Sequence, residues 1–213
     1  ILRLNTEPDG DLSFGVSHDY NTWRQWIPND NPYYHSVAAF NVLRTPVYSF
    51  GHRNAQGIVW GNVNGTWRLY SSEHGDKSDD EINSVLPATN YGWPKVAGMG
   101  VDNNYSSLDA FANNDRLASS LINYAENTWA TTNSMQRPLF ATFNWAASAI
   151  PADGSNIFTW GTIAPSSIDL YKGNIPGWKN SLLVTYLKYG MYRLKLKSTG
   201  DFVDSASSTN TVD

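Results

Sequence analysis

Cysteine is absent from this sequence, and so are long apolar runs and runs of one charge. Without cysteine, no disulfide framework or thiolate metal site can form, and the redox compartment cannot be read from thiols. No apolar run approaches the roughly 20 residues of a membrane-spanning helix, so we expect no membrane span. No lysine and arginine run could follow a phosphate backbone and the net charge is -4, so we do not expect a nucleic-acid partner.

Aromatic residues and glycine characterise what is present. The 213 residues include 9 tryptophans, 12 tyrosines, 8 phenylalanines and 16 glycines, and only 16% of the chain is charged. This composition is typical of aromatic and β-branched strands separated by glycine turns. The length suits one domain or at most two. We therefore predict an all-β protein with a well-buried core.

Four segments stand apart from the regular strand pattern. Residues 1–5 alternate like a strand with no polar lead-in, which predicts a chain that begins inside a fold. Residues 11–45 mix aromatic side chains with asparagine and proline and are predicted to be an ordered surface excursion. Apolar residues at helical spacing predict a helical insertion over 108–129. The polar residues 205–213 predict a frayed tail or another cut point.

Two stretches repeat the same order of signals: a strand, a glycine or asparagine turn, a tryptophan, a second strand and a closing glycine. The predicted strands are 47–50, 57–60, 67–73 and 80–86 in the first meander, and 168–171, 181–186 and 191–197 in the second. Repeated four-stranded meanders are typical of β-propeller blades, and a β-sandwich with a coincidental repeat is the alternative. Propellers close with typically about 4–8 blades, so we expect this chain to be a fragment.

The predicted loops gather groups suited to a bound anion. In a propeller, the loops that lead into a blade and the loops between its second and third strands open on one face. The residues in these loops are Arg53, Asn54, Gly75, Asp76, Thr162 and Lys188. A guanidinium, an ammonium, a hydroxyl and glycine-flanked carbonyls suit a polyanion with a cation beside it. A structural ion pair at Arg53 and a solvated lysine at Lys188 are the alternatives.

Several motifs, in order along the chain, resemble the soluble quinoprotein glucose dehydrogenases. They are ILRLNTEPDG, FGHRNAQG, SEHGDKSDDEIN, NYGWPKVAG, WGTIAPSS, YKG and GWKNSLLVTYLKYG. The family consists of six-bladed β-propellers that use pyrroloquinoline quinone (PQQ) and calcium. The resemblance runs from Ile1 to about Leu196 and implies that residues 1–213 are part of one propeller domain, covering about two to three blades plus the helical insertion.

The resemblance also implies roles for individual residues. It assigns PQQ binding to Arg53, Asn54, Trp160, Thr162 and Lys188, and the cofactor's calcium to backbone carbonyls of Gly75 and Asp76. The family more often has proline where Asp76 and Gly161 stand, and tyrosine where Ile157 stands. These departures affect the cation site and the contacts to the ring and the substrate.

A second, structural calcium cluster near the family's dimer contact matches Glu81, Tyr91, Ala97 and Glu126. Met99 and Val101 stand where oxygen ligands are expected, and a solvated acidic turn at residues 79–81 is the alternative. We interpret His52 and His74 as hydrogen-bonded orienting residues and not as catalytic bases.

The parent protein that the resemblance implies is a periplasmic or secreted enzyme. It would oxidise an aldose at the anomeric carbon to a lactone and pass electrons to an external acceptor. The resemblance places the histidine base before Ile1 and further cofactor arginines after Asp213, so no catalytic residue is assigned to this chain, which alone should be inactive. The alternatives are a non-catalytic propeller that binds partners and a carbohydrate-binding β-domain that stacks sugars on tryptophan and tyrosine.

Overall fold

A computed structural model describes residues 1–7, 26–28, 30–36, 42–75, 78–100, 126–142, 156–188, 190–204 and 209–211. Within these ranges the chain is mostly β, with one α-helix, α3 (Glu126–Thr132), and one short 3-10 helix, η4 (Ile157–Thr159). Most of the predicted helical insertion, residues 108–125, lies outside the described residues. No helix in the described part of the chain is long and apolar enough to cross a membrane.

The chain divides into two compact units, and the smaller one comprises Ile1–Phe50 with Leu86–Asn90. In it, β1 (Tyr34–Ser36) pairs antiparallel with β2 (Val42–Arg44), and β3 (Ser49–Phe50) pairs in parallel with β7 (Thr89–Asn90). Residues 1–5 were predicted to form a strand, but they make only a single bridge between Leu2 and Val47. The terminal ammonium of Ile1 donates to the carbonyl of Ser49 at 2.9 Å.

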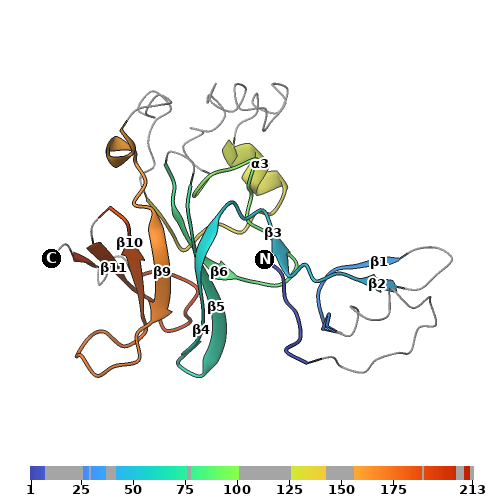
Figure 1. Ribbon diagram of the computed structural model, residues 1–213, viewed down its shortest axis with the longest axis horizontal. Helices are drawn as coiled ribbons and strands as arrows, with labels where there is room; N and C mark the ends of the chain where they lie inside the picture. The colour runs from blue at the N-terminus through green and yellow to red at the C-terminus, as the bar shows by residue number, and fades with distance from the viewer. Residues whose placement is uncertain are drawn as a thin grey trace. The chain divides into compact units, whose positions relative to one another are not determined.

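The larger unit comprises Gly51–Val85 with Tyr91–Asp213 and contains two four-stranded antiparallel sheets (Figure 1). The first sheet has the order β4 (Ala55–Val63), β5 (Thr66–Glu73), β6 (Glu81–Val85) and β8 (Phe140–Ala141). The second has the order β9 (Pro165–Leu170), β10 (Ser181–Tyr186), β11 (Gly190–Lys195) and β12 (Thr209–Thr211). The two predicted meanders are therefore present as two sheets with the same strand order.

The membership of the first sheet differs from the prediction. Residues 47–50 were predicted as its first strand, but β3 pairs with β7 and the fourth strand is β8, which pairs with β6. At Gly51 a φ of 76° turns the chain between β3 and β4. Local periodicity identifies strands but not their partners, so a fourth strand more than fifty residues after the third was not apparent. In the second sheet, β12 pairs with β11 where a frayed tail was predicted.

A tight hairpin sets the register of β4 and β5. Asn64 and Gly65 both have positive φ, 51° and 93°, which matches the right-handed twist of the two strands. The side-chain oxygen of Asn62 accepts the Gly65 N–H at 2.8 Å. The pairing then runs from Val63 opposite Thr66 to Ala55 opposite Glu73, with an irregularity between Ala55 and Gly57.

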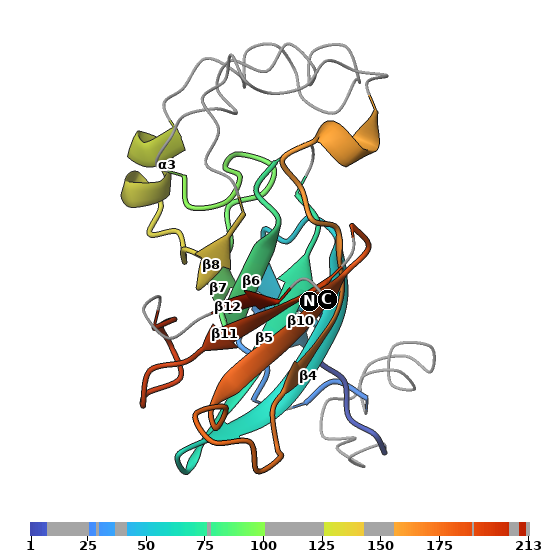
Figure 2. The same ribbon diagram turned by 90° about the vertical axis from the view of Figure 1, so that its left-hand side faces the viewer.

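One hydrophobic core joins the two sheets. It comprises Val63, Tyr70, Ile82, Ile168, Leu170, Leu182, Val184, Leu194 and Leu196, all at most 5% exposed. Two glycines of β4 allow close approach to β9: an added Cβ at Gly57 would lie 2.8 Å from the Ile168 nitrogen, and one at Gly61 would lie 2.6 Å from Leu170 Cδ2. The first strands of the two sheets thus run side by side (Figures 1 and 2), as in neighbouring propeller blades.

Candidate functional site

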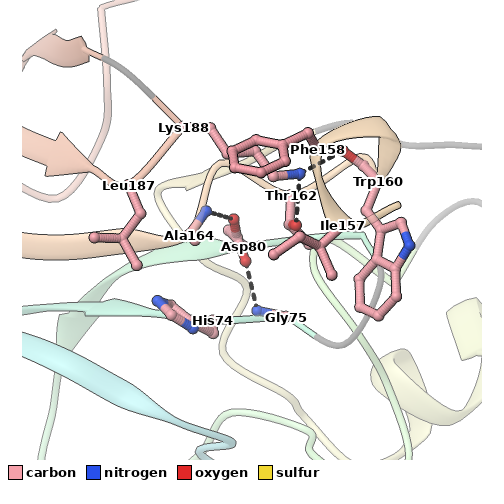
Figure 3. Close-up of a pocket in the computed structure, with 10 residues that line it drawn as sticks. All are labelled: His74, Gly75, Asp80, Ile157, Phe158, Trp160, Thr162, Ala164, Leu187 and Lys188. Atoms are coloured by element: carbon pink, nitrogen blue, oxygen red, sulfur yellow. Dashed lines mark hydrogen bonds between the residues drawn. The ribbon is translucent and has the colours of Figure 1, made fainter. Parts of the chain in front are cut away.

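A cavity of about 370 Å³ lies where loops from the two sheets of the larger unit meet (Figure 3). Its walls are formed by His74, Gly75, Asp80, Ile157, Phe158, Trp160, Thr162, Ala164, Leu187 and Lys188. These residues come from the segment between β5 and β6, from η4 and the loop into β9, and from the turn after β10. The predicted convergence of loops from two repeats therefore places Gly75, Trp160, Thr162 and Lys188 around one cavity.

Lys188 brings a positive charge to this cavity. Its ammonium donates to the carbonyl of Trp160 at 2.8 Å and to the hydroxyl of Thr162 at 3.3 Å. Desolvation lowers the pKa of Lys188 below its ordinary value, and the negative charge of Asp80 opposes that shift. The alternative of a fully solvated lysine does not fit these contacts, because both acceptors belong to the cavity wall.

Asp80 is an anionic group at the base of the cavity and was not among the predicted site residues. It is 1% exposed. Burial raises the pKa of its carboxyl group, while hydrogen bonds from the backbone of Ala164, Gly75 and Ile163 oppose the shift. The charge of Asp80 is therefore compensated by backbone N–H groups of the cavity wall and by the more distant ammonium of Lys188.

Gly75 forms part of the wall because no side chain fits there. A Cβ on Gly75 would lie 1.8 Å from the carbonyl oxygen of Ser78, far inside any van der Waals contact. The backbone of this loop is thus the only surface that Gly75 offers to the cavity. Asp76, predicted to share the same role, lies outside the described residues.

Arg53 and Asn54 adjoin the cavity without lining it. The carbonyl of Asn54 accepts the His74 N–H at 2.9 Å, and an Arg53 guanidinium nitrogen donates to the carbonyl of His74 at 3.3 Å. The guanidinium also lies over the ring of Trp93, 5.2 Å from its centroid. Arg53 and Asn54 therefore contact His74, which lines the cavity, but they do not line it themselves. Their direct contact with a ligand stays a prediction.

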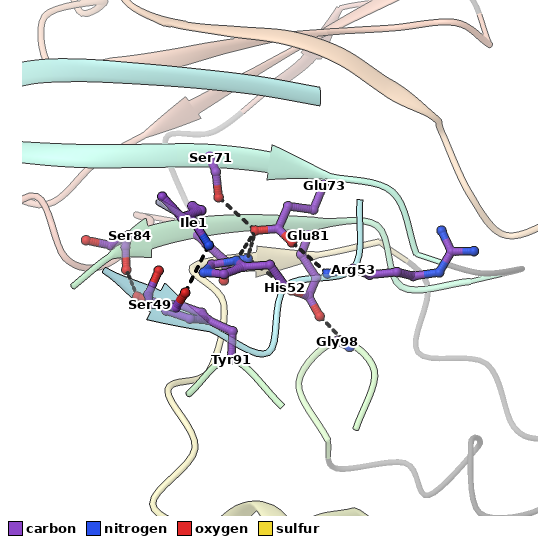
Figure 4. Close-up of polar contacts among 11 residues, drawn as sticks. Ile1, Ser49, His52, Arg53, Ser71, Glu73, Glu81, Ser84, Tyr91 and Gly98 are labelled. Atoms are coloured by element: carbon purple, nitrogen blue, oxygen red, sulfur yellow. Dashed lines mark hydrogen bonds and ion pairs between the residues drawn. The ribbon is translucent and has the colours of Figure 1, made fainter. Parts of the chain in front are cut away.

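A buried polar network supports the loop that carries Arg53 (Figure 4). Glu73 accepts a hydrogen bond from His52 Nδ1 at 2.6 Å, from the Arg53 N–H at 3.2 Å and from the Ser71 hydroxyl at 2.9 Å. Burial would raise the pKa of Glu73, but the interactions with His52 and the hydrogen bonds from Ser71 and Asn83 together lower the pKa. His52 thus makes a buried hydrogen bond to Glu73 and orients the loop.

His74 is held by a hydrogen bond across to the other sheet. Its Nε2 lies 2.8 Å from the carbonyl oxygen of Pro165, at the start of β9. A carbonyl oxygen only accepts, so Nε2 carries the hydrogen. A histidine held in this way by a backbone carbonyl fits the interpretation of His74 as an orienting residue.

Three of the four residues predicted for a second cation site, Glu81, Ala97 and Glu126, meet at the loop of Ala97 and Gly98. Glu126 accepts the Ala97 N–H at 3.0 Å, and Glu81 accepts the Gly98 N–H at 2.8 Å, so two carboxylates meet consecutive backbone amides. The Tyr91 hydroxyl donates to the carbonyl of Ser84 at 2.6 Å. Burial, and then the charge of Glu73, raise the pKa of Glu81 to about 8.

Within the described part of the chain, no three acidic or histidine side chains are arranged to hold a metal ion. The predicted inclusion of Ala97 would add a backbone carbonyl to the ligand set, an oxygen donor that calcium accepts. The alternative of a solvated acidic turn does not fit residues 79 and 80, which are each 1% exposed.

Sequence reasoning also missed the apolar rim of the cavity. Phe158 and Leu187 line it and are 57% and 65% exposed, and Ile157, previously noted only as a departure from the family pattern, joins them. The signal for Leu187 was its place next to Lys188 after a predicted strand. For Asp80 the signal was weak: the acidic run 79–81 at the start of β6 fits a solvated turn equally well.

Comparison with known proteins identifies the family. The family model for Glucose / Sorbosone dehydrogenase matches residues 24–150. Quinoprotein glucose dehydrogenase B of Acinetobacter calcoaceticus is 36% identical over 191 residues, covering 81% of this chain and 38% of that protein. An aldose sugar dehydrogenase of Escherichia coli (strain K12) is 40% identical over 85 residues, covering 38% of this chain and 20% of that protein.

A crystal structure of a glucose dehydrogenase matches the fold with a TM-score of 0.53 and 25% identity, covering 87% of this chain and 42% of that chain. The present chain spans only 38% of the length of the quinoprotein relative. The paired four-stranded sheets and the ordered motifs agree with these matches. Since the family model covers residues 24–150 of 213, more than half of the sequence, the chain belongs to the Glucose / Sorbosone dehydrogenase family.

Proposed function

We propose that this chain is a segment of a PQQ- and calcium-dependent dehydrogenase that oxidises aldose sugars at the anomeric carbon to lactones. The observation that carries the proposal is the cavity between two blades, with the ammonium of Lys188 fixed in its wall by Trp160 and Thr162. The family membership and the name of the quinoprotein relative support it. The complete protein would pass its electrons to an external acceptor.

The residues of the cavity fit PQQ, a planar quinone with three carboxylates. Lys188 supplies a fixed cation. The guanidinium of Arg53 lies behind the wall, bonded to the carbonyl of the lining residue His74. Phe158 and Trp160 supply aromatic surface for a flat ring system. Lys188 and Thr162 would hold a carboxylate or carbonyl edge of the ring, with Arg53 and Asn54 beside them.

The loop at Gly75 fits a calcium ion. Its lack of a side chain and its tight approach to the Ser78 carbonyl leave backbone oxygen as the donor, a ligand that calcium accepts readily. Gly75 and Asp76 would supply carbonyl ligands. When bound, the quinone would accept hydride from the sugar, and calcium would polarise the accepting carbonyl. The protein's own part is to orient the cofactor and to exclude water with the apolar rim.

A second calcium ion would have a structural role. Glu81 and Glu126, with oxygens of Tyr91 and Ala97, form the proposed ligand set. Both side chains accept N–H groups of consecutive residues, Ala97 and Gly98, so they lie at one loop; Glu81, whose pKa is raised by burial to about 8, would have to ionise to bind a cation. The family resemblance places this cluster near a homodimer contact.

The chain by itself should not oxidise sugars. His52 and His74, its histidines near the site, are engaged with Glu73 and with the Pro165 carbonyl. The base that removes the proton of the anomeric hydroxyl would come from the remaining blades. For the complete protein we propose a periplasmic or secreted location.

Quenching of tryptophan fluorescence tests the cofactor assignment. PQQ should quench the fluorescence of the chain in the presence of calcium, and Trp160→Phe should reduce the quenching while leaving the affinity nearly unchanged. Lys188→Met should weaken binding by about tenfold or more, the effect of losing a charge-assisted contact. Trp67→Phe, at an exposed tryptophan that does not line this cavity, is the matched control. Equal affinity in Lys188→Met would contradict the proposal.

A non-catalytic propeller that binds partners is the second candidate function. The observation in its favour is Ile157, which lines the cavity at the position where the family resemblance expects tyrosine; Gly161, between the lining residues Trp160 and Thr162, is a second departure from the family pattern. If a folded chain fails to bind PQQ in the presence of calcium, this candidate gains support.

A further inference from the structure

The carboxylate of Asp80 joins two loops that belong to different sheets (Figure 3). Its Oδ1 accepts the N–H of Gly75 at 2.8 Å, in the segment that follows β5. Its Oδ2 accepts the N–H of Ile163 at 2.5 Å and that of Ala164 at 2.7 Å, in the loop that leads into β9. Each oxygen therefore serves a different wall of the same cavity.

Asp80 is itself fixed from behind. Its N–H donates to the hydroxyl of Thr142 at 3.2 Å, and its carbonyl accepts the Thr142 N–H at 2.9 Å. Thr142 directly follows β8, the strand paired with β6. With backbone and side chain both engaged and only 1% of the residue exposed, the carboxylate is held at one position.

The loop held by Asp80 in turn holds the segment that carries Lys188. The carbonyl of Ala164 accepts the Leu187 N–H at 3.0 Å, and the carbonyl of Ile163 accepts the Lys188 N–H at 3.4 Å. Ala164 has a φ of 56°, a conformation that a non-glycine residue adopts only when its surroundings impose it. Two segments of the cavity wall therefore bond to one carboxylate directly, and a third is held through the loop of Ile163 and Ala164.

We propose that Asp80 is a positioning residue that sets the spacing between the glycine loop at Gly75 and the loop of Thr162 and Lys188. This spacing would determine whether one ligand can contact both walls at once. The identity of that ligand rests on the proposed function. The tether itself is a property of this chain alone, so the two can be tested separately.

Asp80→Asn is the informative substitution. Asparagine has one acceptor oxygen, which can accept the N–H groups of only one of the two loops. Its amide nitrogen is a donor and would face the N–H groups of the other loop, which then lose their acceptor. Either the Gly75 amide or the Ile163 and Ala164 amides should exchange with solvent about tenfold faster or more, as expected when a buried charge-assisted hydrogen bond is lost. The amide of Leu182, in the core strand β10, should be unaffected. PQQ affinity in calcium should fall by a similar factor.

Tyr70→Phe is the matched control. Tyr70 is fully buried in the same unit, and its hydroxyl donates to the Gly200 carbonyl at 2.8 Å, but it does not line the cavity. The substitution should lower the free energy of unfolding while leaving the exchange of the Gly75, Ile163 and Ala164 amides and the PQQ affinity unchanged. It thereby separates a local effect at the cavity from a general loss of stability.

The outcomes are distinct. If Asp80→Asn leaves all three amides as protected as before, the tether is refuted. If protection is lost but PQQ affinity stays within about twofold, the positioning role is refuted. If the unsubstituted chain binds no PQQ, the proposed function and the role of Asp80 in cofactor binding fail together, while amide exchange still decides the tether.

A variant that does not fold still leaves a decisive measurement on the unsubstituted chain. One carboxylate closes all three hydrogen bonds, so the Gly75, Ile163 and Ala164 amides should show similar protection from exchange. A Gly75 amide that exchanges like an open loop, beside protected Ile163 and Ala164 amides, would overturn the inference.

Discussion

Replacing Glu73 with glutamine should lower the free energy of unfolding by about 3 kcal/mol at pH 7. Glu73 accepts a hydrogen bond from His52 at 2.6 Å, and the two side chains are only 2% and 8% exposed. Its other oxygen accepts the N–H of Arg53 at 3.2 Å. The substitution keeps the shape of the side chain and removes the charge and one acceptor.

The magnitude follows from these contacts. A hydrogen bond to a charged group is worth about 1.5–3 kcal/mol and a neutral one about 1 kcal/mol, so weakening the contact to His52 costs roughly 0.5–2 kcal/mol. The glutamine amide nitrogen then faces the Arg53 N–H, and a buried donor without an acceptor costs a further 1–3 kcal/mol, approximately. Breaking a buried ion pair costs about 3–5 kcal/mol, but the imidazole can keep a hydrogen bond to the glutamine oxygen, so the lower end applies.

Urea and thermal unfolding, followed by tryptophan fluorescence and circular dichroism, measure the effect. A loss of about 3 kcal/mol corresponds to a fall in Tm of roughly 6–12 °C for a chain of this size. Glu7→Gln, at an exposed glutamate, is the matched control and should stay within about 0.5 kcal/mol. If Glu73→Gln stays within the same limit, the network in Figure 4 does not hold the loop of Arg53.

Further predictions concern the cavity and the contact between the sheets. Gly75→Ala should disrupt the loop after β5 and weaken PQQ binding by about tenfold or more, because its Cβ would meet the Ser78 carbonyl; unchanged affinity would argue against this loop as part of the site. Gly61→Ala should cost about 1–3 kcal/mol in urea unfolding, because its Cβ would press on Leu170, and a neutral result would mean that β4 and β9 pack less closely. Desolvation lowers the pKa of Lys188 below its ordinary 10.5, so between the two values the unfolded chain binds more protons. Stability should therefore rise with pH toward 10.5 more steeply than in Lys188→Met, and equal slopes would contradict the shift.

Much of the local structure could be predicted because it is encoded locally. The strands predicted at 168–171 and 181–186 and the turn before Trp67 are each encoded within a few residues, and they correspond to β9, β10 and the Asn64–Gly65 turn. The partners of the edge strands could not be predicted in this way. The pairing of β6 with β8, and of β11 with β12, depends on which segment returns to the sheet edge after a long connection.

The residues of the candidate site also divide into those that local sequence predicts and those that depend on distant segments. Gly75 and Lys188 follow strand ends and Thr162 lies in the loop that leads into β9, so their convergence could be predicted from the repeat. Asp80 could not, because an acidic residue before a strand is usually solvated, and its burial depends on N–H groups from a loop more than eighty residues away.

The most direct test of the cofactor assignment is a calorimetric titration of PQQ into the chain, once with calcium and once with chelator. We predict binding that depends on calcium and is lost in Lys188→Met, since the ammonium and the carbonyls of the Gly75 loop would act on the same ligand. A chain that circular dichroism shows to be folded, yet that binds no PQQ in the presence of calcium, would contradict the account.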